Sequence, residues 1–276
     1  SENTMQLDNR QLDLYLKRIG QERPQNLDFA ALAAIHKAHL MTFTWEGLDG
    51  FMGWPSSIDP QRIFDKMVTG RRGGWCYEMN GLLGAALAGL GFRVTRLCGG
   101  VNRAKLGDVA IGNHLTLRVD LDRAYLAEAG VADAIVEPVP LTVGPISQSG
   151  FDFSIMPTAD GWLRFHNHAL GLAPSFDFRP DHQDEAALAA SQEWLMRDPA
   201  SPFTGALAIV RHTAEGYVAL QNNGLRRVTA AGATEQTIDS MGAFADVLDD
   251  VFQLDVPRHG RVWEKVQAVL DRDEAA

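Results

Sequence analysis

A single cysteine follows two glycines at the start of a long apolar helix pattern, and this segment most constrains the fold and chemistry of the chain. Residues 71–78 read Arg-Arg-Gly-Gly-Trp-Cys-Tyr-Glu, and apolar residues then recur at helical spacing to about Leu90. Gly73 and Gly74 allow a tight turn that places Cys76 at the N-terminus of this helix. There the unpaired backbone N–H groups and the helix dipole favour an anion, and thiolate is the reactive form of cysteine. Cys76 is therefore a candidate nucleophile; the alternative is a small apolar core residue.

A second segment offers the partners that such a nucleophile needs. Residues 114–121 alternate polar and apolar side chains, which predicts a half-buried strand, and 125–128 is a plausible return strand after a turn. If the hairpin is symmetric about Leu121, His114 lies opposite Glu128, within reach of a carboxylate–imidazole hydrogen bond. A nucleophile, a base and a residue that orients the base are the parts of covalent acyl transfer. The alternative for His114 is a strand histidine beside solvent.

Several segments in a fixed order resemble the arylamine N-acetyltransferases. The motif over 72–80, with its Arg-Gly-Gly-aromatic-Cys core, and the strand that begins His114-Leu115-Thr116-Leu117 look like the family's cysteine and histidine segments. Residues 12–20 are similar to its opening helix, 43–49 to its Pro-Phe-Glu-Asn-Leu-Asp segment, and 198–204 to its Ser-Pro-Phe segment. The resemblance covers nearly the whole chain.

The resemblance implies an α+β fold related to cysteine proteases and transglutaminases. A helical domain over 1–92 would carry the cysteine, a β-barrel domain over 93–205 the histidine and the acid, and an α/β lid over 206–276 would complete the chain. The sequence pattern agrees: helical segments come first, and short alternating segments from Phe92 to about Gly216 favour an antiparallel barrel or sheet. Residues 185–197 read as a helical insertion, and 241–252 and 262–270 as helices near the end.

The resemblance also implies a reaction. Acetyl-CoA, as co-substrate, would acylate Cys76, and an arylamine, arylhydrazine or N-hydroxyarylamine would then take the acetyl group, a chemistry of xenobiotic metabolism. His114 would be the base, forming an ion pair with the Cys76 thiolate, and the two displacements predict ping-pong kinetics.

The third residue of the triad departs from the family pattern. Residues 127–132 correspond to the family's Val-Asp-Val-Gly-Phe-Gly segment, so Glu128 stands at the aspartate position. The hairpin is one residue shorter than in the family, which we expect to compensate for the longer side chain. Asp120, Asp122 and Asp133 are the competing acids.

The same resemblance suggests residues around the nucleophile. Phe43, Phe203 and Val131 are candidates for the acceptor pocket, with Val131 standing where the family has phenylalanine; for the two phenylalanines the alternative is ordinary core packing. Glu46 is expected to pair with Arg72 and to fix the glycine turn. The residues expected to support this turn are Arg72, Glu46, Gly73 and Gly74.

Charge and composition limit the partners. The net charge of −10 argues against a general nucleic-acid-binding surface, so phosphate contacts to CoA must be local. Arg71, Arg103 and Lys105 are the candidates for them. With 46% hydrophobic and 22% charged residues, the composition is that of a soluble globular protein.

Other residues suggest structural roles. His166 and His168 would share one face of a strand but lack a third ligand at a recognisable spacing, so no metal is expected. His36 and His39, one helical turn apart, are assigned to the surface or to packing. Cys98 is assigned to the core, which argues against a disulfide. No signal peptide and no apolar run near the ~20 residues of a spanning helix is visible, so we expect a cytoplasmic, reducing location and no membrane.

Three functional hypotheses remain open. The favoured one is an acetyl-CoA-dependent arylamine N-acetyltransferase with a Cys76-His114-Glu128 triad. The second is a related acyltransferase with another donor or acceptor, such as the amide synthases of polyketide pathways, and the changed 128–132 segment keeps it open. The third is a catalytically weak CoA-binding or interaction protein on the same fold. A protease or transglutaminase is disfavoured because the whole-chain likeness is to acetyltransferases.

Overall fold

The computed structural model describes residues 6–275, and its N-terminal part is helical. The helix that begins at Cys76 is buried along most of its length, which explains why its sequence is apolar on all sides. It packs against the preceding helices and against two strands that follow it. The helices of this part are α1 (Asn9–Ile19), α2 (Phe29–Thr42), α3 (Leu48–Met52), α4 (Pro60–Phe64) with its continuation η1 (Asp65–Thr69), and α5 (Cys76–Leu90).

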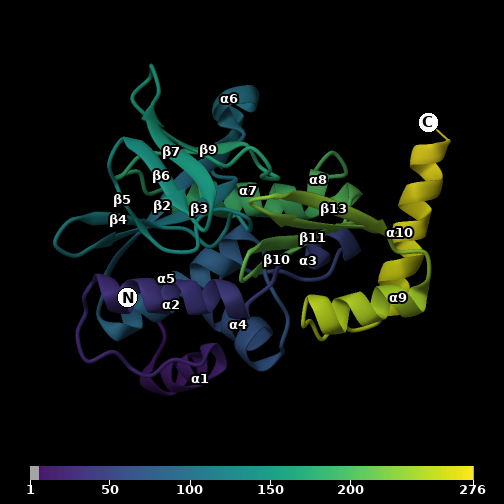
Figure 1. Ribbon diagram of the computed structural model, residues 1–276, viewed down its shortest axis with the longest axis horizontal. Helices are drawn as coiled ribbons and strands as arrows, with labels where there is room; N and C mark the ends of the chain where they lie inside the picture. Colours follow the sequence, from purple (N-terminus) through teal and green to yellow (C-terminus); the bar gives the residue numbers. More distant parts are fainter. Residues whose placement is uncertain (1–5, 276) are drawn as a thin grey trace.

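The middle of the chain forms an antiparallel eight-stranded sheet that curls into a nearly closed barrel (Figure 1). The strand order is β5-β4-β3-β2-β9-β8-β7-β6, and phenylalanines fill much of its core. The strands are β2 (Arg93–Val101), β3 (His114–Asp120), β4 (Ala124–Ala127), β5 (Val139–Pro140), β6 (Gly144–Gln148), β7 (Phe151–Pro157), β8 (Leu163–His166) and β9 (Ser175–Phe178). Two short helices, α6 (Arg103–Leu106) and η2 (Gly107–Ala110), connect β2 to β3.

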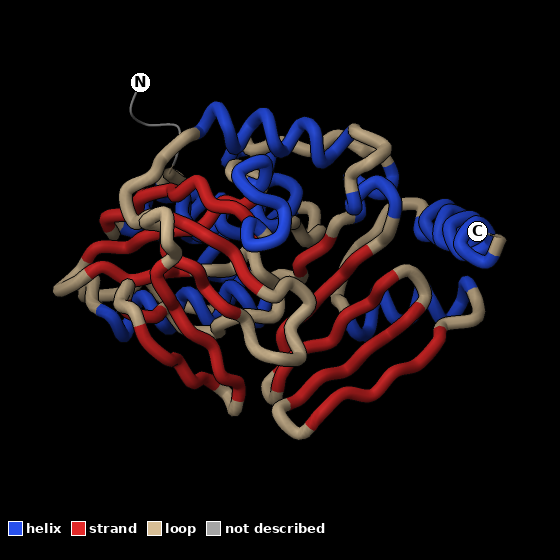
Figure 2. Tube along the Cα trace, turned by 90° about the horizontal axis from the view of Figure 1, so that it is seen from above, coloured by secondary structure: helices blue, strands red, loops and turns tan. Residues whose placement is uncertain are grey.

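The C-terminal part is a second antiparallel sheet with helices beside it, as Figure 2 shows. It follows α7 (Glu185–Arg197), which has the predicted bounds, and α8 (Pro202–Gly205). Its edge strand β1 (Trp45–Glu46) comes from the N-terminal part and pairs with β10. The remaining elements are β10 (Ala208–Thr213), β11 (Gly216–Gln221), β12 (Gly224–Thr229), β13 (Gly232–Thr237), α9 (Met241–Asp246), η3 (Val247–Val251) and α10 (His259–Glu274).

The predicted α+β architecture is confirmed, whereas the division at residues 92 and 205 stays a prediction. Residues 1–5 and 276 of the predicted outer domains lie outside the described residues. Between Gln6 and Ala275, no helix combines the length and the apolar character that crossing a membrane requires.

The predicted register of the histidine hairpin is wrong by two residues, because its centre lies one residue further along the chain. Asp120 pairs with Ala124, so the hairpin is centred on Asp122 rather than on Leu121. The reason is a three-residue turn, in which the Leu121 N–H donates to the Arg123 carbonyl. Strand β4 then ends at Ala127, and Glu128 lies just beyond the ladder.

Candidate active site

Cys76 opens helix α5 and lies almost entirely out of solvent, with 7% of its surface exposed. Its Sγ lies 3.7 Å from the carbonyl oxygen of Asn113, the residue before His114. The glycine turn in front of it is crowded: a Cβ at Gly73 would lie 2.0 Å from the Thr44 carbonyl oxygen, and one at Gly74 would lie 2.6 Å from the Glu78 Cβ. Only glycine therefore fits both positions of the turn.

The predicted contact between His114 and Glu128 is present in the core. The His114 Nε2 and the Glu128 Oε2 lie 2.9 Å apart, and both side chains are fully buried. Burial disfavours the charged imidazole, but the Glu128 carboxylate and the interaction with Cys76 favour it more, and the pKa of His114 rises to about 10. The Nδ1 of the same ring has no hydrogen-bond partner among residues 6–275. Cys76, His114 and Glu128 thus form one interacting set.

Glu128 keeps its charge in the core because donors surround it. Burial alone would raise the pKa of this carboxyl, yet the His114 charge and the hydrogen bonds to it leave that pKa lowered. The Asn80 Nδ2 donates to Oε1 at 2.9 Å, and the backbone N–H groups of Gly130 and Val131 donate to the same oxygen. Glu128 is therefore an ionised partner for the His114 ring.

The three competing acids are bound by groups other than His114. Asp120 binds Arg118, and Asp122 binds Arg123 at the exposed turn. Asp133 accepts hydrogen bonds from Asn167 and from the Leu172 N–H. None of these carboxylates contacts His114.

Two buried residues that the sequence analysis did not assign to the site hold Glu128 in place. Besides its bond to Oε1, Asn80 accepts from the Ala129 N–H, and its place one helical turn after Cys76 is a signal that could have found it. His36 accepts from the Glu128 N–H at 3.0 Å, and its Nδ1 lies 2.9 Å from the Val136 carbonyl oxygen. The sequence analysis expected His36 and His39 to have a surface or a packing role. Both are fully buried, so the packing role is correct.

Replacing His36 tests this support. His36→Leu leaves the Glu128 N–H and the Val136 carbonyl without partners in the core, so we expect the free energy of unfolding to fall by about 2 kcal/mol. Urea denaturation measures this change. His166→Leu, at an exposed histidine, is the control and is expected to have little effect; equal stabilities for the two variants would contradict the assignment.

A cavity of about 820 Å³ reaches Cys76 and His114 and is lined mainly by apolar side chains. Phe203 and Val131 line it, and their role in binding the acceptor stays a prediction. Phe43 does not: it is buried in the N-terminal core, where it stacks on Tyr15 and packs against His39. Trp45 on β1 lines the cavity instead of Phe43. Further apolar residues of the lining are Leu106, Val109, Leu172, Trp194, Leu195 and Val210.

The expected pair of Glu46 and Arg72 belongs to a larger buried cluster behind the glycine turn. The Arg72 Nε and Nη2 lie 2.9 and 2.7 Å from Glu46 Oε1, and Nη2 also lies 2.8 Å from Asp49. Lys66 Nζ lies 2.7 Å from Asp49 and 2.8 Å from Glu78. We call these five residues the charge cluster: Glu46, Asp49, Lys66, Arg72 and Glu78.

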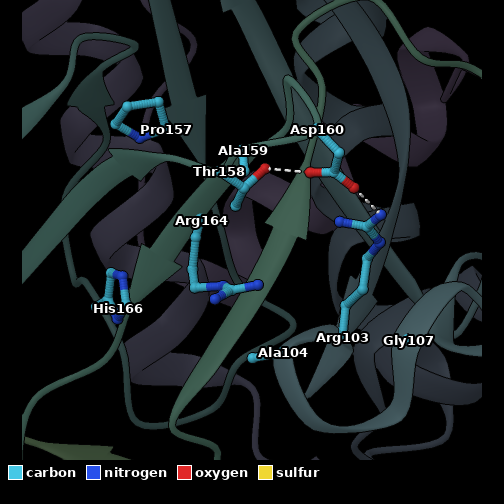
Figure 3. Close-up of a pocket in the computed structure, with 9 residues that line it drawn as sticks. All are labelled: Arg103, Ala104, Gly107, Pro157, Thr158, Ala159, Asp160, Arg164 and His166. Atoms are coloured by element: carbon cyan, nitrogen blue, oxygen red, sulfur yellow. Dashed lines mark hydrogen bonds and ion pairs between the residues drawn. The ribbon is translucent and has the colours of Figure 1, made fainter.

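None of the three candidates for phosphate contacts lines the Cys76 cavity. The expectation for Arg103 is wrong, because its guanidinium is already shared by Asp108, Asp160 and Asp177. Figure 3 shows its ion pair with Asp160. Arg71 lines a separate cavity with aspartates of the C-terminal part, and Lys105 is exposed on α6. A charge already neutralised by three carboxylates has little attraction left for a phosphate.

The histidine pair does not form the face that the sequence suggested. Strand β8 ends at His166, which is exposed, and His168 lies in the next loop, where it is buried and its Nε2 lies 2.9 Å from the Asp133 carbonyl oxygen. Over residues 6–275, no group of three or more His, Cys, Asp or Glu side chains is arranged to hold a metal ion. Cys98 is buried, and within the same residues both cysteines are free thiols.

Known proteins with similar sequences and structures agree on one family. The N-acetyltransferase family model matches residues 28–261. An arylamine N-acetyltransferase from Mycolicibacterium smegmatis is 30% identical over 93% of this chain and 97% of its own length. The arylamine N-acetyltransferase / N-hydroxyarylamine O-acetyltransferase of Salmonella typhimurium is 27% identical over 87% and 88%.

A solved structure extends the likeness to three dimensions. The Mycobacterium marinum arylamine N-acetyltransferase in complex with CoA superposes with a TM-score of 0.84 at 25% identity, covering 94% of this chain and 99% of that one. Sequence motif, fold and whole-length similarity therefore converge, and the chain belongs to the arylamine N-acetyltransferase family of acyltransferases.

Proposed function

We propose that this enzyme transfers an acetyl group from acetyl-CoA to arylamines, arylhydrazines and N-hydroxyarylamines through an acetyl-Cys76 intermediate. The observation that carries the proposal is the buried set of Cys76, His114 and Glu128 at an apolar cavity. The activities for which the relatives are named and the CoA bound to the Mycobacterium marinum enzyme support the donor and the acceptor class.

The first half-reaction transfers the acetyl group to the enzyme. The Cys76 thiolate attacks the thioester carbonyl carbon of acetyl-CoA, a bond to Sγ forms, and the bond to the CoA sulfur breaks. His114, charged because Glu128 faces its Nε2, gives a proton to the departing CoA thiolate. Glu128 stays ionised and holds the ring in one orientation.

The second half-reaction releases the product. The acceptor amine attacks the acetyl carbon, the carbon–sulfur bond to Cys76 breaks, and His114 takes the proton from the amine. The rings of Trp45, Trp194 and Phe203 give the cavity aromatic surface suited to an aromatic acceptor. The two half-reactions share one cavity, which supports ping-pong kinetics.

The proposal extends to the setting of the enzyme. A reducing, cytoplasmic location keeps the Cys76 thiol available, and acetylation of foreign aromatic amines places the enzyme in xenobiotic metabolism. The division into a helical domain, a barrel and a lid at residues 92 and 205 belongs to the same proposal.

A related acyltransferase with a larger acyl donor, such as an amide synthase, is the second candidate. The specific observation in its favour is the small side chains of Val131 and Ala132 in the wall of an 820 Å³ cavity, which leave room for more than acetyl.

Intact mass spectrometry with acetyl-CoA tests the proposal. The wild type is expected to gain one acetyl group and to lose it when an arylhydrazine is added, whereas Cys76→Ser gains none because a serine hydroxyl is far less nucleophilic. Cys98→Ser, at the other buried thiol, is the matched control and is expected to behave like the wild type. An unmodified wild type would overturn the proposal and favour the second candidate.

A further inference from the structure

The charge cluster holds more carboxylates than cations. Glu46, Asp49 and Glu78 are at most 6% exposed, and their ion pairs within residues 6–275 are with Lys66 and Arg72. If all five groups were ionised, one negative charge would remain in the protein interior. A buried unpaired charge is strongly unfavourable, so the cluster favours a proton on one carboxylate.

Glu78 is the carboxylate that touches the turn in front of Cys76. Its Oε2 accepts from the Trp75 N–H at 3.2 Å, which caps the N-terminus of α5. Lys66 contacts both carboxylate oxygens, at 3.0 and 2.8 Å, and so fixes this cap from η1. Through Trp75, the position of Glu78 sets the position of Cys76.

Glu78 is also the member whose charge is least stable. Burial raises its pKa to about 7, the neighbouring Asp49 and Glu46 act in the same direction, and Lys66 opposes them. A separate cavity of about 490 Å³, lined by Glu78, Asp49 and Lys66, gives protons a route to it. This cavity shares no lining residue with the cavity at Cys76.

We propose that Glu78 is a positioning residue for Cys76: its ionised carboxylate holds the Trp75 N–H and Lys66, and its protonation releases this hold and slows the chemistry of Cys76. The charged groups around Glu78 are Lys66 from η1, Asp49 from α3, Glu46 from β1 and Arg72 from the glycine turn. Arg62 and Arg258 line the same cavity as Glu78. The inference rests on the proposed function only in taking Cys76 as the nucleophile.

The raised pKa gives Glu78 opposite effects on stability and on reactivity. Between the ordinary carboxyl pKa and about 7, the folded state keeps a proton that the unfolded chain has lost, so stability falls as pH rises through this window. Above about pH 7, the ionised Glu78 side chain holds the turn but lowers the stability of the folded state. Glu78→Gln is therefore expected to raise Tm at about pH 8, relative to the wild type, and to leave Tm nearly unchanged at about pH 5.

The rate of Cys76 alkylation by iodoacetamide, followed by intact mass between about pH 5.5 and 8.5, tests the inference without any acyl donor. In the wild type we expect an acidic limb near pH 7, and its assignment to Glu78 rests on the loss of this limb in Glu78→Gln. In Glu78→Gln the limb is absent, and the rate at pH 8 falls about tenfold because the cap is weakened. Glu185→Gln, which removes a carboxylate from the first turn of α7, is the matched control and keeps the wild-type profile.

Two results would overturn the inference. One is a Glu78→Gln variant that keeps the acidic limb; the other is a Tm below that of the wild type at both pH values together with an unchanged rate. If Glu78→Gln does not fold, Asp49→Asn gives a second test, because removing a neighbouring negative charge shifts the limb to lower pH, and an unshifted limb refutes the assignment. Failure of acetylation by acetyl-CoA alone would count against the proposed function and leave this test standing.

Discussion

Glu128→Gln is expected to lower the rate of Cys76 acetylation about 10³-fold, the largest effect among variants that leave the nucleophile and base intact. The amide keeps the shape of the side chain but removes the negative charge that stabilises the charged His114 ring. It also allows the amide nitrogen to face Nε2, which favours the wrong tautomer. Single-turnover acetylation followed by mass spectrometry measures the change.

The competing carboxylates provide the controls for this prediction. Asp120→Asn and Asp122→Asn change groups that bind arginines away from the site, and we expect acetylation within about twofold of the wild type. Asp133, the third competing acid, lies in the cavity wall. Asp133→Asn tests it with a side chain of the same shape. Full activity in Glu128→Gln, with loss of activity in one of these three variants, would show that another acid orients His114.

Gly73→Ala is expected to have the largest effect on stability, lowering the free energy of unfolding by about 3 kcal/mol or more. The added Cβ would lie 2.0 Å from the Thr44 carbonyl oxygen, and because that atom belongs to the backbone, the chain itself must move. The same movement separates Glu46 from the turn, since the Glu46 Cγ lies next to the same position. Urea denaturation and the thermal midpoint measure the loss.

Gly242→Ala is the matched control for this substitution. Gly242 lies in α9, where a Cβ would meet open space, and alanine favours helix, so stability is expected to rise slightly. If Gly73→Ala were as stable as this control, the close approach of the turn to Thr44 would not be a constraint on the fold.

The elements of the site that could be predicted from the sequence are those that depend on the spacing of nearby residues. The helix from Cys76 follows from apolar periodicity, and the two glycines before it follow from the need for a tight turn. The sequence predicts Glu128 as the partner of His114, yet the hairpin register used for this prediction is wrong. The contact survives because Glu128 lies past the end of β4, where the ladder no longer fixes its direction.

The rest depends on contacts between distant segments. His36 reaches Glu128 across a long sequence separation, and no periodicity in α2 marks it as different from other buried residues. Phe43 and Trp45 are both aromatic, and only the pairing of β1 with β10 decides that Trp45 faces the cavity. Arg103 resembles any exposed cation in the sequence, but Asp160 and Asp177 from distant segments join the nearby Asp108 around it.

The pairing of β1 with β10 has a consequence for synthesis of the protein on the ribosome. Trp45 pairs with Val210 and also forms a bridge to Gly74, so the strand beside the glycine turn gains its neighbour only when the chain has been made past residue 210. Contacts of such long sequence separation form late. A nascent chain therefore carries the glycine turn in front of Cys76 without the β10 neighbour of its supporting strand until translation has passed residue 210.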